Sequence, residues 1–129
     1  MIYQGNAITV VRGDDDIATL TFDLQDESVN KLSSAVVTEL DEAVKALQGE
    51  SGLAGLLLTS AKEAFIVGAD ITEFQAMFGK GGDFLESMLV RVHGIFNAIE
   101  DLPFPTVTAI NGLALGGGCE LLLTTDFRV

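Results

Sequence analysis

The chain has 129 residues, 48% of them hydrophobic, and its 19 Asp and Glu outweigh its 7 Lys and Arg to give a formal net charge of -12. This charge repels nucleic acid backbones and anionic lipid surfaces, so neither is an expected partner. The single cysteine, Cys119, excludes an internal disulfide, and with one histidine, His93, it excludes a Cys/His metal site. No apolar run approaches the ~20 residues of a membrane span, and no signal-peptide pattern opens the chain, so we expect a cytoplasmic protein.

The first half of the chain predicts a hairpin, a helix and a buried strand. Residues 7–12 and 17–24 are rich in β-branched residues and flank an acidic turn, which is typical of a hairpin. We assign Asp14, Asp15 and Asp16 to a solvated turn, because the glycine and distal glutamate of a calcium loop do not follow. Helical spacing of apolar residues predicts a helix over 33–48, and the apolar run 53–60 predicts a buried strand.

The second half continues this alternation. Apolar residues at helical spacing predict a helix over 83–100, which Pro103 and Pro105 end, and residues 106–110 predict another buried strand. Strands that alternate with helices indicate an α/β architecture. No linker, repeat or low-complexity tract divides the chain, so we expect one domain.

A glycine-rich turn follows the last predicted strand. Residues 112–120 read GLALGGGCE, and each glycine within an element costs roughly 0.5–1 kcal/mol relative to alanine. A phosphate site is disfavoured, because neither the P-loop pattern nor G-x-G-x-x-G fits these residues. Two interpretations remain. The glycines either allow close packing of a helix on a strand, or they present free N–H groups to a polarised oxygen.

A second turn favours the interpretation with free N–H groups. Residues 64–74 read AFIVGADITEF, where Asp70 is a candidate helix cap and Glu73 has the spacing of a capping box. Two turns that each offer N–H groups are what an oxyanion hole of two backbone donors requires. Glu120, one helical turn beyond the other glycines, is then placed to act on a bound carbonyl compound.

The segments FIVGADITEF and INGLALGGGCE closely resemble the crotonase (enoyl-CoA hydratase/isomerase) superfamily, and the resemblance covers essentially the whole chain. The segments MIYQGNAITV, ESVNKL and EDLPFPTV resemble the alpha subunits of bacterial fatty acid oxidation complexes. The resemblance implies the crotonase fold of repeated strand-strand-helix units, of which residues 1–129 form the N-terminal portion. It also implies hydration of trans-2-enoyl-CoA to 3-hydroxyacyl-CoA in β-oxidation, with enoyl-CoA isomerisation as a further activity.

The resemblance assigns roles to individual residues. The N–H groups of Ala69 and Gly117 would form the oxyanion hole, and Glu120 would be the catalytic acid that holds and activates the water adding to C3. The residues that would line the path of the thioester and pantetheine are Ile66, Val67, Gly68, Asp70 and Gly116.

The family's second catalytic glutamate would lie beyond Val129, so we expect residues 1–129 alone to be inactive. Asp126 lies six residues beyond Glu120, about 600° round a helix, and is a poor substitute. Thr72 stands where related enzymes often carry a lysine near the CoA phosphates. We interpret Lys31 and Lys62 as surface lysines.

Cys119 next to Glu120 suggests either a thiol nucleophile assisted by His93 or, as we prefer, a small buried cysteine. We interpret His93 as a surface or edge residue. The apolar stripe of residues 84–99 fits core packing better than the lining of an acyl tunnel.

The resemblance implies an acyl-CoA substrate, no metal and no cofactor in this chain, with NAD needed only by a dehydrogenase domain outside it. The implied partner is the thiolase beta subunit of the complex, and we expect self-association of residues 1–129. Three alternatives stay open: an inactive segment that only binds CoA, a segment used for assembly with the partner subunit, and a crotonase relative with another acyl-CoA reaction.

Overall fold

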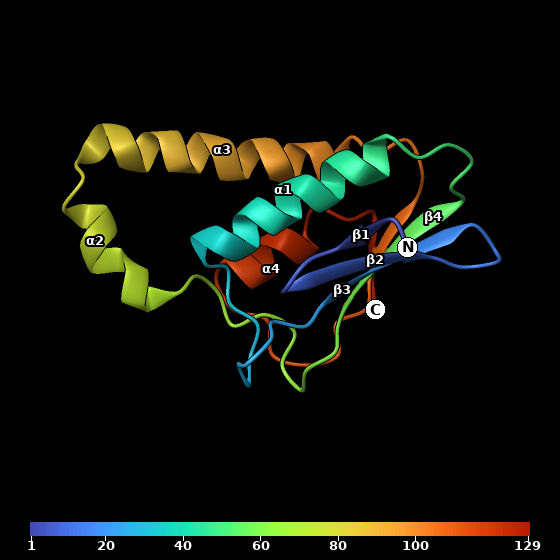
Figure 1. The fold of residues 1–129 in the computed structure, drawn as a ribbon, viewed down its shortest axis with the longest axis horizontal. Coiled ribbons are helices and arrows are strands. Elements are labelled where there is room, and N and C mark those ends of the chain that lie inside the picture. The colour runs from blue at the N-terminus through green and yellow to red at the C-terminus, as the bar shows by residue number, and fades with distance from the viewer.

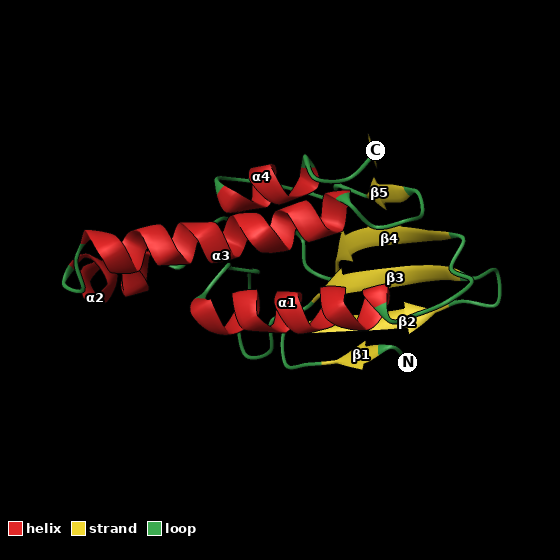
Figure 2. Ribbon diagram, turned by 90° about the horizontal axis from the view of Figure 1, so that it is seen from above, coloured by secondary structure: helices red, strands yellow, loops and turns green.

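The computed structural model describes residues 1–129, which form one sheet with the helices on one of its faces (Figures 1 and 2). The six strands follow one another across the sheet in the order β1-β2-β3-β4-β5-β6. The first three pair antiparallel and the last four pair parallel. The strands are β1 (Tyr3–Gln4), β2 (Ile8–Arg12), β3 (Ile17–Phe22), β4 (Gly55–Ser60), β5 (Thr106–Thr108) and β6 (Phe127–Arg128).

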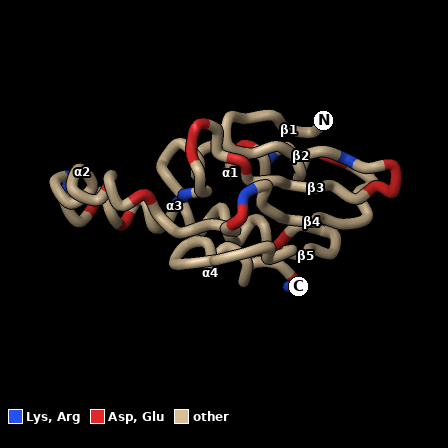
Figure 3. The backbone as a smooth tube through the Cα atoms, turned by 90° about the horizontal axis from the view of Figure 1, so that it is seen from below, with Lys and Arg blue, Asp and Glu red and all other residues tan.

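The helices are α1 (Ser34–Gln48), the 3₁₀ helix η1 (Ile71–Glu73), α2 (Phe74–Phe78), α3 (Gly82–Glu100) and α4 (Gly117–Leu122). The predicted hairpin is confirmed as β2 and β3, and the acidic turn lies at its tip (Figure 3). The predicted helix over 33–48 is confirmed as α1, and the oxygen of Ser33 accepts a hydrogen bond from the Val36 N–H. The two predicted buried strands are confirmed as β4 and β5.

The core lies between the sheet and the helices. Side chains alternate along a strand, so Ile8 and Val10 of β2 and Ala18, Leu20 and Phe22 of β3 are buried in one cluster with the apolar residues of α1. The fully buried side chains include Val10, Leu20, Leu40, Leu47, Leu58, Phe65 and Ile66. At the edge of the sheet, Tyr3 donates a hydrogen bond from its hydroxyl to Glu42 of α1 at 2.7 Å.

Helix α3 corrects the prediction of a continuous core stripe. Only Ile95, Phe96 and Ile99 of this helix are buried, whereas Leu89 is 58% exposed. The helix has 19 residues, about 28 Å at 1.5 Å per residue, and its N-terminal half extends past the sheet together with α2 (Figure 1). The sheet therefore covers only the C-terminal half of the stripe. None of the helices combines the length and the apolar character needed to cross a membrane.

Candidate active site

The two glycine-containing turns lie side by side. The Phe65 N–H donates to the Leu113 carbonyl at 2.9 Å, and the Leu115 N–H donates to the Ile66 carbonyl at 3.0 Å. Ile66 and Ala114 thereby form an isolated parallel bridge. Segments that are about fifty residues apart in the sequence are thus fixed against each other by backbone hydrogen bonds.

Glycines allow this close approach. A Cβ on Gly118 would lie 2.5 Å from the Ile66 carbonyl oxygen, and one on Gly68 would lie 3.2 Å from the Leu115 carbonyl oxygen. Gly68 and Gly116 also have φ values of +108° and +51°, which side chains with a Cβ rarely adopt. The glycines thus allow α4 to pack closely on the first turn, and this packing brings the two turns together.

The proposed oxyanion donors follow directly after these contacts. The backbone of Ala69 follows buried Gly68, and Gly117 is the first residue of α4. Neither the Ala69 N–H nor the Gly117 N–H donates to another backbone group, so both are available to an acceptor oxygen. On its other side the first turn is held by a hydrogen bond from the Leu32 N–H to the Gly68 carbonyl at 2.8 Å.

Asp70 caps the short helix η1, as predicted, but the capping box is wrong. The Asp70 carboxylate accepts hydrogen bonds from the N–H and the hydroxyl of Thr72 at 3.0 and 2.6 Å. Both hydrogen bonds lower the pKa of Asp70, and the one from the Thr72 hydroxyl has the larger effect. The positive charge of Lys31 lowers this pKa further. Glu73 does not return to the cap. Its carboxylate instead accepts from the N–H and hydroxyl of Ser34, which ties η1 to the start of α1.

Glu120 is exposed on α4 and lines a groove of about 250 Å³ between α3 and α4. Two further titratable side chains, His93 and Glu100, lie in the same groove. The sequence alone does not predict that His93 and Glu100 lie near Glu120, because they belong to a different helix. Their seven-residue spacing predicts only that they share one face of α3. His93 is exposed, as predicted. The residues that line this groove include neither Ala69 nor Gly117.

Two predictions about the neighbours of Glu120 need correction. Cys119 is exposed rather than buried, because α4 turns Gly118, Leu121 and Leu122 toward the core. Asp126 does not continue the helix, which ends at Leu122. Its carboxylate accepts hydrogen bonds from the N–H and hydroxyl of Thr106, so it fixes the start of β5.

The two lysines near the turns form ion pairs. Lys31 lies 3.6 Å from Glu27, and Lys62 lies 2.9 Å from Asp23. Only 14% of the Lys62 side chain is exposed, so the interpretation as a surface lysine suits Lys31 better.

Beside the first turn, two adjoining grooves run along α3. One, of about 340 Å³, extends from Thr72 and Glu73 past Met77 of α2 to Phe84 and Met88. The other, of about 310 Å³, shares Phe84 and Met88 and adds Val37 of α1. Phe84 and Met88, from the N-terminal half of the α3 stripe, thus line a groove instead of packing in the core.

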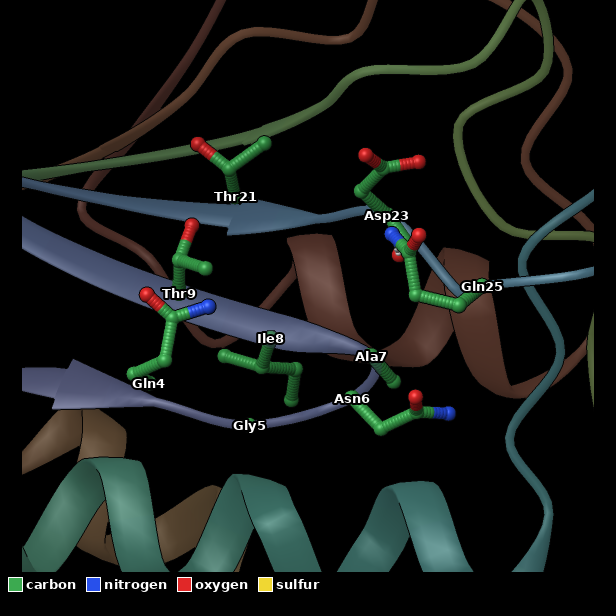
Figure 4. A pocket seen from close by; sticks show the side chains of 9 residues that line it. All are labelled: Gln4, Gly5, Asn6, Ala7, Ile8, Thr9, Thr21, Asp23 and Gln25. Atoms are coloured by element: carbon green, nitrogen blue, oxygen red, sulfur yellow. Dashed lines mark hydrogen bonds between the residues drawn. The ribbon is translucent and has the colours of Figure 1, made fainter.

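A separate hollow of about 390 Å³ lies over β1, β2 and β3 (Figure 4). It is lined by amides and hydroxyls such as those of Gln4, Thr9 and Thr21, and its one charged residue, Asp23, is paired with Lys62. This hollow contains no residue predicted for catalysis.

Comparison with known proteins places this geometry in a family. Residues 12–129 match the family described as Enoyl-CoA hydratase/isomerase. The chain belongs to that family. It is similar over its whole length to proteins named fatty acid oxidation complex subunit alpha, with 52% identity to the one from Psychrobacter sp. and 50% to the one from Acinetobacter baylyi. The chain spans 18% of the length of each of these relatives.

Solved structures show the same fold. An enoyl-CoA hydratase/carnithine racemase from Magnetospirillum magneticum matches with a TM-score of 0.87 and 28% identity, over 97% of this chain and 46% of that one. An enoyl-CoA hydratase from Bacillus anthracis matches with a TM-score of 0.82 and 31% identity, over 95% of this chain and 46% of that one. The predicted crotonase fold is confirmed.

Proposed function

We propose that residues 1–129 supply the oxyanion hole and one catalytic carboxylate for the hydration of trans-2-enoyl-CoA in fatty acid β-oxidation. The observation that carries this proposal is the pairing of the two turns, which leaves the N–H groups of Ala69 and Gly117 free on adjacent segments. Membership of the enoyl-CoA hydratase/isomerase family supports the same reaction.

In this mechanism the thioester oxygen accepts hydrogen bonds from the Ala69 and Gly117 N–H groups. Charge develops on that oxygen when a nucleophile adds to C3, and donors that are already in place stabilise it more than they stabilise the substrate. Glu120 accepts a proton from a water molecule whose oxygen bonds to C3. The product gains this hydroxyl at C3 and a proton at C2. The same two N–H groups would also stabilise the dienolate that forms when a 3-enoyl thioester loses a proton from C2, and protonation of that dienolate at C4 gives the 2-enoyl thioester.

The substrate would lie along the first turn. Ile66, Val67, Gly68 and Asp70 would border the thioester and pantetheine on one side, and Gly116 on the other. The groove that starts at Thr72 and passes Phe84 and Met88 would take the acyl chain, because it is apolar and lies next to that turn.

The coenzyme A thioester is the substrate, and we assign no cofactor or metal to these residues. We also propose that they do not complete hydration alone, because Asp126, the acid that follows Glu120, is engaged by Thr106. The thiolase beta subunit remains the proposed partner, and an NAD site would belong to a separate dehydrogenase domain.

The test is Glu120→Gln in the full natural chain that contains these residues. Hydration of crotonyl-CoA, followed by the loss of enoyl thioester absorbance, should fall by about 10²–10⁴-fold, the usual contribution of a positioned acid or base. Folding and CoA binding should be retained. The matched control is Glu100→Gln, which removes a charge from the same groove. Unchanged turnover in Glu120→Gln, or an equal loss in both variants, would contradict the role of Glu120.

A further inference from the structure

Asn30 is a buried polar side chain that the proposed chemistry does not use. It is 2% exposed, and its amide lies among backbone groups from three segments. Its Nδ2 lies 3.2 Å from the Phe22 carbonyl, 2.8 Å from the Ser60 hydroxyl and 3.1 Å from the Phe65 carbonyl, so its two hydrogens are shared among three acceptors. Its Oδ1 accepts from the Leu24 N–H at 3.0 Å. A buried amide with every polar atom satisfied specifies one local arrangement.

These contacts join the ends of two strands to the first turn. Phe22 ends β3 and Ser60 ends β4, whereas Phe65 opens the turn that leads to Ala69. The Ser60 hydroxyl donates to the Ala64 carbonyl at 2.9 Å, so Asn30 and Ser60 together fix the entry to the turn.

The backbone of Asn30 holds the same turn one step further along. The Val67 N–H donates to the Asn30 carbonyl at 3.0 Å. Asn30 therefore binds residues on both sides of Ile66, whose own carbonyl accepts from Leu115 of the second turn. The position of the first turn relative to the second depends on this short segment.

We propose that Asn30 is a positioning residue that sets the separation of the Ala69 and Gly117 N–H groups, an inference that rests on the proposed function. Asparagine suits this place because one planar side chain both donates to carbonyls and accepts from an N–H. Aspartate has almost the same shape, but when ionised it only accepts, and its charge would face the Phe22 and Phe65 carbonyl oxygens. The turn would then move away from Asn30, and Ala69 with it.

The experiment compares Asn30→Asp with the wild type in the full natural chain that contains these residues. We expect kcat for crotonyl-CoA hydration to fall about 100-fold, the effect of a displacement of about 1 Å in a catalytic group, with KM changed less than threefold. A second readout is the absorbance of a bound 2,4-hexadienoyl-CoA, whose conjugated carbonyl shifts to longer wavelength when hydrogen bonds polarise its oxygen. That shift should shrink in Asn30→Asp.

The control is Val44→Ala, which removes buried contacts on α1 without touching either turn. It should lower the thermal midpoint and leave both kcat and the absorbance shift at wild-type values. If Asn30→Asp does not fold, Asn30→Ser, which keeps one donor and adds no charge, is measured in the same assays with the same expectation. An Asn30 variant with wild-type kcat and shift would overturn the positioning role alone. A wild-type protein that neither hydrates nor shifts the probe would overturn the proposed function and this inference together.

Discussion

Gly118→Ala tests whether the contact between the two turns depends on the absence of a side chain. The new Cβ would lie 2.5 Å from the carbonyl oxygen and 2.8 Å from the Cβ of Ile66. Atoms this close must separate. Ile66 is fully buried, and its carbonyl accepts from Leu115, so the backbone has no free space to move into.

Two opposing effects set the magnitude. Overpacking a buried site costs about 1–3 kcal/mol, and the upper part of this range applies because the obstructing atom is backbone. Alanine favours the helical conformation over glycine by about 1 kcal/mol, which offsets part of that cost. We expect a net loss of about 1–2 kcal/mol in the free energy of unfolding, or a fall of roughly 4–8 °C in thermal midpoint.

Gly94→Ala is the matched control, because it places the same methyl group in the middle of α3, where nothing lies within 4 Å. It should raise the midpoint by a few degrees through helix propensity alone, about 1 kcal/mol. Both midpoints can be measured by circular dichroism of the 129-residue chain. If Gly118→Ala is as stable as the wild type, or gains as much as Gly94→Ala, the close contact with Ile66 is not what this glycine provides.

Three further predictions follow from single features of the fold. Burial and a hydrogen bond to the Glu42 carboxylate raise the pKa of Tyr3, so Tyr3 stabilises the fold below pH ~10 and this stabilisation is lost as the pH rises further. In denaturant titrations, Tyr3→Phe should therefore lose less free energy of unfolding at alkaline pH than the wild type. An equal loss in the two proteins would count against this role. Exposed apolar residues such as Phe78 and Leu89 should cause the chain to self-associate, and salt should increase this association because it screens the repulsion between negatively charged copies. Light scattering should show less association in Phe78→Asp or Leu89→Asp, and a chain that stays monomeric at every salt concentration would refute this. Exchanging the residues at two positions, as Cys119→Glu with Glu120→Cys, should abolish hydration as fully as loss of the acid, and retained turnover would show that any carboxylate there suffices.

Patterns within single segments predicted most of the fold. The hairpin, α1 and the two buried strands follow from local periodicity, which depends on residues that are neighbours in the chain. The exposure of the α3 N-terminal half could not be predicted in the same way, since it depends on how far the sheet extends. A six-residue strand such as β4 is only about 20 Å long, shorter than α3.

The candidate site was less accessible to local reasoning. Spacing indicated two turns with free N–H groups and suggested that they act as a pair. The contact that holds them together, the Ile66–Ala114 bridge, joins distant segments and could not be predicted from local patterns. The capping box failed because Thr72 supplies the donors to the Asp70 carboxylate, and the N–H and hydroxyl of Ser34 supply those to the Glu73 carboxylate. A sequence pattern shows which hydrogen-bond partners a side chain can have, and the fold determines which of them it binds.

The geometry of α4 bears on the proposed role of Glu120. Gly118 must face Ile66, and Leu121, three residues on, shares that buried face. Glu120 lies about 200° round the helix from Gly118, so its carboxylate points away from the contact between the turns and remains exposed. It also lies about 4.5 Å further along the axis than Gly117, and C3 of an enoyl thioester lies two bonds beyond the carbonyl carbon whose oxygen Gly117 would bind. A carboxylate at position 119 would point about 100° round the helix from the direction of Glu120. We therefore expect the variant with Cys119→Glu and Glu120→Cys to be inactive, although its composition and charge are unchanged.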